Sequence, residues 1–181
     1  MRKTEEQRDP PMTSLPVPSR EKSAAAKPLH LVGFMVGNEE FCFEILKVRE
    51  IIRMTPITAV PAAPDHVEGI VNLRGKIVPI VDFRRRFNIT GASTADEAEK
   101  VIVVAATESA TVGFIVDCVS QVMKLPAESL SPAPTGATGY DGEAIRGVGN
   151  VGDRLVIVLD LDKMFSADEM NGLAGTTASR P

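Results

Sequence analysis

The 181-residue chain has no tryptophan, one tyrosine, two histidines and two cysteines. The aromatic side chains on which single-stranded bases stack are therefore scarce. A net charge of -4 also provides no basic face for a nucleic acid. Two histidines and two cysteines, without a C-x-x-C pair, argue against a structural zinc site. We therefore expect neither a nucleic-acid partner nor a bound metal.

Long apolar runs are also missing. No run approaches the roughly 18 to 20 apolar residues that a membrane-spanning helix needs. The N-terminal segment lacks the apolar core of a secretory signal, so we expect a cytoplasmic protein without membrane insertion. Cys42 and Cys118 each lie within a short apolar run, and we expect both to be small buried side chains.

Both ends of the chain are poor in large apolar side chains. Residues 1–28 mix charges of both signs with several prolines, and burial there cannot offset the entropy cost of ordering. We therefore expect a disordered Pro-rich tail over 1–28 and a folded domain over 29–166. A flexible C-terminal tail is expected over 167–181, where small and polar residues dominate.

The segment between the tails reads as many short strands. Runs of about five β-branched and aromatic residues alternate with glycine, proline, asparagine and aspartate. No stretch between them is long enough for a crossover helix, so about ten strands predict an all-β fold of barrels. The two halves show no convincing repeat. The expected strands are 30–36, 41–45, 57–60, 66–73, 76–81, 101–105, 112–117, 119–123, 145–149 and 155–159.

Other local signals predict short helices and one long loop. Asp82 is placed to cap a short helix that runs to Phe87, and Asp160 to cap a last helix that runs to Phe165. Residues 44–54 fit neither the helical nor the strand period, and we interpret them as a helical turn that passes into a short strand. Residues 126–141 are rich in Pro, Gly, Ser and Thr and predict a loop.

A glycine pattern at 147–152 matches the G-x-G-x-x-G spacing of dinucleotide sites. Such a site needs a helix after the glycines, whereas DRLVIVLDL predicts a strand, so a hairpin turn is preferred over a nucleotide-dependent enzyme. Asp153, Asp160 and Asp162 are interpreted as turn and cap residues rather than as a cation site. No G-x-S-x-G motif occurs, and we expect no catalytic residues and no cofactor.

The segment GIVNLRGKIVPIVDF places Arg74, beside Gly75, at the apex of a predicted hairpin. Two apolar strands would hold that apex rigidly, and a rigid base lowers the entropy lost on binding. Arginine is also enriched at interface hot spots. These residues alone leave two interpretations open: an arginine displayed to a partner, or one that only solubilises a turn.

Four segments carry a family resemblance: FMVGNEEFCFEILKVREII, VPAAPDHVEGIVNLRGKIVPIVDFRRRF, VGFIVDCVSQVMKLP and IRGVGNVGDRLVIVLDLDKMF. Through them the chain resembles the CheW family of bacterial chemotaxis coupling proteins over about residues 29–166. The central run, G-x-x-N-L-R-G-x-x-x-P-x-x-D, is specific. No receiver domain follows Phe165 and kinase motifs are absent, so the chain is similar to the coupling protein rather than to CheV or CheA.

The resemblance implies two packed five-stranded SH3-like β-barrel subdomains with short helices. It implies a non-catalytic adaptor that links chemoreceptor cytoplasmic tips to the regulatory domain of the histidine kinase CheA. The alternative is the same role in a non-flagellar array that serves surface motility or development. The implied partner-binding residues are Val48, Glu50, Gly69, Asn72, Arg74, Gly75, Val116 and Val119. Among them Val48 and the glycines would form an apolar surface, with Arg74 and Glu50 setting the register.

Overall fold

The computed structural model describes residues 27–93, 95–133 and 142–178, so the tail expected over 1–28 lies almost wholly outside the described residues. The strands are β1 (Leu29–Val36), β2 (Glu39–Glu44), β3 (Val48–Arg53), β4 (Val67–Leu73), β5 (Lys76–Asp82), β6 (Val101–Ala106), β7 (Thr111–Val116), β8 (Cys118–Leu125), β9 (Leu130–Ser131), β10 (Ile145–Val151) and β11 (Arg154–Leu159). The α-helices are α1 (Phe83–Arg86) and α2 (Ala167–Ala178), and the 3-10 helices are η1 (Ala127–Ser129) and η2 (Leu161–Lys163).

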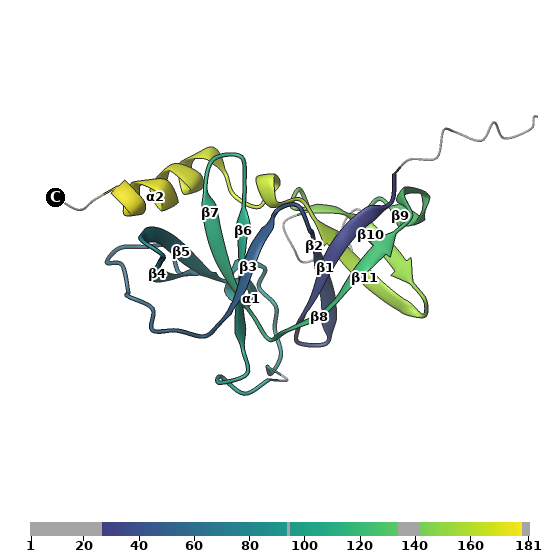
Figure 1. The fold of residues 1–181 in the computed structure, drawn as a ribbon, viewed down its shortest axis with the longest axis horizontal. Helices are drawn as coiled ribbons and strands as arrows, with labels where there is room; N and C mark the ends of the chain where they lie inside the picture. Colours follow the sequence, from purple (N-terminus) through teal and green to yellow (C-terminus); the bar gives the residue numbers. More distant parts are fainter. Residues whose placement is uncertain (1–26, 94, 134–141, 179–181) are drawn as a thin grey trace, which may run out of the picture.

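The strands form two barrels that lie side by side, with α2 over one of them (Figure 1). We call the sheet β3-β6-β7-β5-β4 the central barrel and the sheet β8-β1-β2-β11-β10-β9 the terminal barrel. The prediction of an all-β fold with two SH3-like barrels is confirmed. The terminal barrel differs from the expected five strands only by the two-residue strand β9 at its edge.

The two barrels share one strand pattern in a permuted order. Each barrel contains two antiparallel hairpins whose second strands pair with each other in parallel. These second strands are β5 and β7 in the central barrel, and β11 and β2 in the terminal barrel. A fifth strand, β3 or β8, pairs with the first strand of the hairpin that contains β7 or β2. The central barrel follows this pattern in chain order, whereas the terminal barrel takes its last two strands from the start of the chain.

This permutation hides an internal repeat, so the expectation of no repeat is wrong. The β4–β5 and β10–β11 hairpins match without a gap, through the helical segment that follows each of them. Each first strand also has an irregular register just before its first matched glycine. The identical pairs are Gly69 with Gly147, Asn72 with Asn150, Val78 with Val156, Asp82 with Asp160, and Phe87 with Phe165.

The core between the barrels contains all seven phenylalanines of the chain. They are Phe34, Phe41, Phe43, Phe83, Phe87, Phe114 and Phe165. Phe43 of the terminal barrel and Phe114 of the central barrel lie 5.3 Å apart between ring centroids, and such pairs add about 0.5–1.5 kcal/mol beyond area burial. On β2, Phe41 and Phe43 face this shared core while Cys42 faces the interior of the terminal barrel. Both faces of β2 are therefore buried, which explains its continuous apolar run.

Several local predictions are confirmed and others are corrected. Asp82 caps α1 and accepts a hydrogen bond from the Arg85 amide at 3.2 Å, as expected. The strand expected at 57–60 is reduced to a single bridge from Thr58, because prolines precede and follow this segment and cannot donate. Cys118 is exposed rather than buried, because it begins β8 where that strand leaves the shared core. The loop expected over 126–141 begins instead with η1 and β9.

The expectation of a flexible tail over 167–181 is wrong for α2. Ser166 and Glu169 form a capping box: the Ser166 amide donates to Glu169 Oε2 at 2.8 Å, and the Glu169 amide donates to Ser166 Oγ at 3.2 Å. Leu173, 5% exposed, packs into the shared core. The segment capped by Asp160 is a 3-10 helix, Leu161–Lys163, and it is followed by α2 rather than being the last helix.

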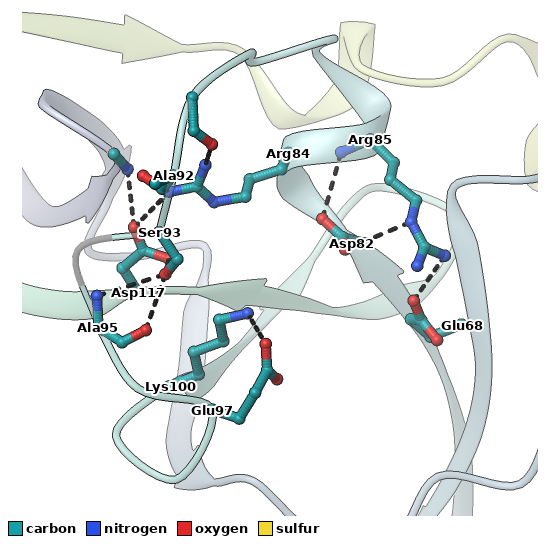
Figure 2. A network of polar contacts seen from close by, with 12 residues as sticks. Glu68, Asp82, Arg84, Arg85, Ala92, Ser93, Ala95, Glu97, Lys100 and Asp117 are labelled. Carbon is teal, nitrogen blue, oxygen red and sulfur yellow. Dashed lines mark hydrogen bonds and ion pairs between the residues drawn. The ribbon is translucent and has the colours of Figure 1, made fainter.

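A buried ion pair fixes the point where the chain crosses from the central to the terminal barrel (Figure 2). Asp117, 2% exposed, accepts hydrogen bonds from Arg84 Nη2 at 2.8 Å, the Gly37 amide at 2.7 Å and Ser93 Oγ at 2.8 Å. Burial alone would raise the pKa of Asp117, but these three donors together hold that pKa below its ordinary value. The node therefore joins the β1–β2 turn to α1.

Replacing the Asp117 carboxylate should be costly. Asp117→Asn leaves the Arg84 guanidinium, 16% exposed, without its counter-charge and should lower the free energy of unfolding by about 3 kcal/mol at neutral pH. Because the folded-state pKa is lowered, this contribution is present above the unfolded pKa of about 3.9 and is lost as pH falls through the folded pKa. Urea unfolding at neutral and acid pH checks both statements. The control Glu68→Gln removes an ion pair with Arg85, whose side chain is 56% exposed, and should change little; equal losses would contradict the argument.

Candidate partner-binding surface

The β4–β5 hairpin has the tight turn that its sequence predicts. Arg74 and Gly75, its two central residues, have φ of 52° and 85°, as two-residue hairpin turns of the primed type require. Asn72 Oδ1 accepts a hydrogen bond from the Gly75 amide at 2.8 Å and fixes the turn from its own base. The Arg74 side chain is 84% exposed, so the apex presents its guanidinium outward.

The ion pair at this apex spans the two edges of the central barrel. Arg74 Nη2 lies 3.0 Å from Glu50 Oε2, and Glu50 belongs to β3, at the opposite end of the sheet order. Below it, Thr58 and Ile70 exchange two backbone hydrogen bonds of 2.9 and 2.8 Å. A surface pair of this kind contributes about 0–1 kcal/mol, so its effect is to position the side chains rather than to hold the barrel.

Gly69 lies beneath this closure rather than on the surface. Its φ is 151°, and a Cβ atom there would approach the Thr58 carbonyl oxygen to 2.2 Å. Only glycine allows the two backbones to come so close. Gly69 therefore supports this edge of the barrel from below, and its own contact with a partner stays a prediction.

We call Glu50, Asn72, Arg74 and Gly75 the seam surface, because they lie where the two sheet edges meet. Val48 begins β3 two residues before Glu50, is half-buried, and packs against the shared core. The register of β3 shifts between Val48 and Glu50, a bulge of the kind that often re-aims side chains at sheet edges. The structure thus places four of the eight residues that the resemblance implies close together at this edge of the barrel, and their contact with a partner stays a prediction.

The other face of β3 adds residues that the sequence analysis missed. Ile51 is 45% exposed and lies between the exposed side chains of Arg49 and Arg53. The signal was present in VREIIR, where polar and apolar residues alternate and one isoleucine must fall on the outer face. An exposed apolar side chain between two cations suits a contact with an acidic, partly apolar partner.

Val116 and Val119 do not join the seam surface. Val116 is 1% exposed in the shared core, opposite Val101 of β6. Val119 is half-buried opposite Phe34 and packs against the same core. Both flank the Asp117 node, so they belong to the junction between the barrels.

The glycine pattern at 147–152 has a packing explanation. Gly147 and Gly149 lie in β10, where Cβ atoms would approach the Ser131 carbonyl oxygen to 2.6 Å and a Leu125 methyl to 2.7 Å. Gly152, with φ of 62°, makes the turn, and the strand predicted after it is confirmed as β11. The predicted turn is thus shorter than the motif, most of which is strand.

Other chemistry has little support in the part of the chain that the structure describes. No group of three or more His, Cys, Asp or Glu side chains in it could hold a metal ion. Burial, with the charge of Glu40, raises the pKa of the Cys42 thiol to about 12, which leaves it protonated and a poor nucleophile. None of the helices in the described ranges is long and apolar enough to cross a membrane.

The chain is similar to known proteins over most of its length. Residues 30–169 match the family model described as the CheW-like domain. The chain is 40% identical to the chemotaxis protein CheW of Klebsiella aerogenes over 137 residues, 76% of this chain and 81% of that protein. It is 38% identical to CheW of Rhizobium meliloti over 139 residues, 77% of this chain and 88% of that protein. The crystal structure of the scaffolding protein TtCheW from Thermoanaerobacter tengcongensis aligns with a TM-score of 0.71 and 29% identity, covering 81% of this chain and 93% of that one.

The hydrogen bond from the Gly75 amide to Asn72 Oδ1 can be tested directly. Asn72→Ala removes the acceptor of the Gly75 amide, so hydrogen exchange at that amide should become about fivefold faster. The control is Asn150→Ala, the matched asparagine of the terminal barrel, which should leave exchange at Gly75 unchanged. Two-dimensional NMR exchange measurements decide, and unchanged protection at Gly75 in Asn72→Ala would show that the turn does not depend on this side chain.

Proposed function

The chain belongs to the CheW-like domain family, and from that premise we propose that it is a non-catalytic adaptor of a chemosensory array. In this role it links the cytoplasmic tips of chemoreceptors to the regulatory domain of the histidine kinase CheA. The observation that carries the proposal is the seam surface, where the specific N-L-R-G run of the family resemblance forms a fixed, outward-facing turn.

The geometry suits recognition rather than chemistry. Asn72 holds the turn and Glu50 holds the Arg74 guanidinium, so little side-chain freedom remains to be lost on binding. The Arg74–Glu50 pair also presents both charge signs within one small area, which favours a partner with a complementary pair and disfavours wrong registers. Val48 and Gly69 supply or shape apolar surface beside this pair.

Signals would then pass as shifts in contacts between partners, since coupling requires only that each partner bind two arrangements differently. Val116 would act through the shared core, because its side chain is not accessible. Val119, half-buried at the junction, stays a proposed contact residue. The Asp117 node between the barrels would keep these two regions in a fixed relation to the seam surface.

Charge reversal at the apex tests the contact. Arg74→Glu should weaken recruitment by about tenfold or more in co-sedimentation with kinase and receptor assemblies. An arginine that becomes buried when a partner binds commonly contributes this much binding energy. The control Lys124→Glu makes the same charge change on the exposed face of β8 and should have little effect.

A double variant separates a direct contact from an indirect one. Glu50→Arg with Arg74→Glu rebuilds the pair across the seam with its charges exchanged. If Arg74 touches the partner, recruitment should stay weak although the local pair is restored. Undiminished recruitment of both kinase and receptor by Arg74→Glu would remove Arg74 from the contact, and separate measurements with each partner show which of them it contacts.

A further inference from the structure

A second buried acid lies in the terminal barrel, whereas the seam surface belongs to the central barrel. Glu40 of β2 is 5% exposed, and its Oε1 accepts a hydrogen bond from Ser120 Oγ of β8. Its Oε2 is buried without a hydrogen-bond partner among the described residues. The nearest cation, Arg154 Nη1, lies 3.3 Å away, on a side chain that is 54% exposed. One acceptor of this carboxylate is therefore only partly compensated.

The fold makes room for this carboxylate. Gly33 lies beside it on β1, and a Cβ atom there would approach Ser120 Oγ to 2.6 Å and Glu40 Oε1 to 2.8 Å. Any other residue at this position would push the carboxylate or the hydroxyl away. Gly33, Ser120 and Glu40 come from three neighbouring strands, so the carboxylate is held by the barrel wall itself.

The barrel does not need a charge at this position. In the hairpin repeat, Val158 of the terminal barrel corresponds to Ile80 of the central barrel. Val158 pairs in parallel with Cys42, and Ile80 pairs in parallel with Gly113, so Cys42 corresponds to Gly113. Counting back two residues from each partner, Glu40 corresponds to Thr111 in the central barrel. A neutral threonine serves there, whereas a buried, incompletely paired carboxylate costs free energy. Stability of the fold thus gives no reason for the acid.

Glu40 also borders an open cavity of about 380 Å³. Met35, Leu155 and Ile157 supply its apolar lining, and Leu155 is 61% exposed. Arg154 lies in the same lining, as the only cation there among the described residues. The cavity therefore combines a buried negative charge with exposed apolar side chains, and these would contact the stem and the neighbour of an inserted basic side chain.

We propose that this cavity, the Glu40 pocket, binds an arginine or lysine side chain of a partner protein, with an apolar neighbour of that residue packed on Leu155. Arg154 acts as the resident competitor and swings toward solvent when the partner's cation donates to Glu40 Oε2. The site is separate from the seam surface, so the adaptor would engage a further partner segment through its other barrel.

A peptide titration tests this proposal without knowledge of the partner. The probe is N-acetyl-leucyl-arginine amide, added at millimolar concentration to the ¹⁵N-labelled full chain, with the matched peptide carrying citrulline as the neutral control. Saturable shifts of the Gly33, Ser120 and Leu155 amides with the arginine peptide alone are expected. Equal shifts with the citrulline peptide, shifts centred elsewhere, or no saturable shift would overturn the proposal.

Two variants should move the affinity in opposite directions. Glu40→Gln should weaken binding of the arginine peptide by about tenfold or more, because it removes the charged acceptor. Arg154→Ala should tighten binding by about two- to fivefold, because it removes the competitor. The control Glu128→Gln makes the same charge change on an exposed side chain outside the pocket and should leave affinity unchanged.

Because the Arg154 side chain is 54% exposed, Arg154→Ala should fold even if Glu40→Gln does not. In that case the affinity of Arg154→Ala for the arginine peptide tests the proposal by itself. Weaker or unchanged binding in Arg154→Ala would overturn the proposal. An equal loss in Glu128→Gln would do the same, since it would reveal general attraction to an acidic protein. Failure here would leave the seam surface untouched, because no residue of the Glu40 pocket belongs to it.

Discussion

The phenylalanine core between the barrels is the constraint on which the rest of the structure depends. Each barrel contributes only short strands, and a unit of that size buries too little surface to be stable alone. The chain compensates by placing every phenylalanine at the junction, where Phe43 and Phe114 meet from matching strands. Docking of the barrels is therefore part of folding, and the orientation of the seam surface relative to the terminal barrel follows from this packing.

Local chemistry allowed the sequence to predict the β4–β5 hairpin, and tertiary contacts explain what it missed. Arg74 at the apex and Asp82 as a cap follow from neighbouring residues, so both were readable. Glu50 was placed at the surface only through family resemblance, because its ion pair joins two ends of a sheet. The capping box of α2 could have been predicted from Ser166 and Glu169, but the small residues that follow them favoured a flexible tail instead. The repeat was hidden because its halves do not occur in the same order along the chain.

The two buried carboxylates differ in how fully their hydrogen-bond acceptors are satisfied. Both carboxylate oxygens of Asp117 accept hydrogen bonds, and the donors come from both barrels, so its role is to hold the junction. Glu40 has one hydrogen-bond donor, Ser120, and one ion-pair partner on a half-exposed side chain, Arg154, with an open cavity beside it. Sequence alone could not distinguish them, since each is an acid within or beside an apolar run.

The permuted order of strands also determines when each barrel has all of its strands during synthesis on the ribosome. The central barrel spans one continuous segment, so all of its strands have been made once β7 has emerged. The β1–β2 hairpin precedes the other strands but pairs with β8 and β11, which are made later, and it carries three of the seven phenylalanines meanwhile. Such long-range pairing is slow, and it leaves apolar surface exposed until β11 has been made. The first strands of this protein to be made are thus among the last to complete their pairing.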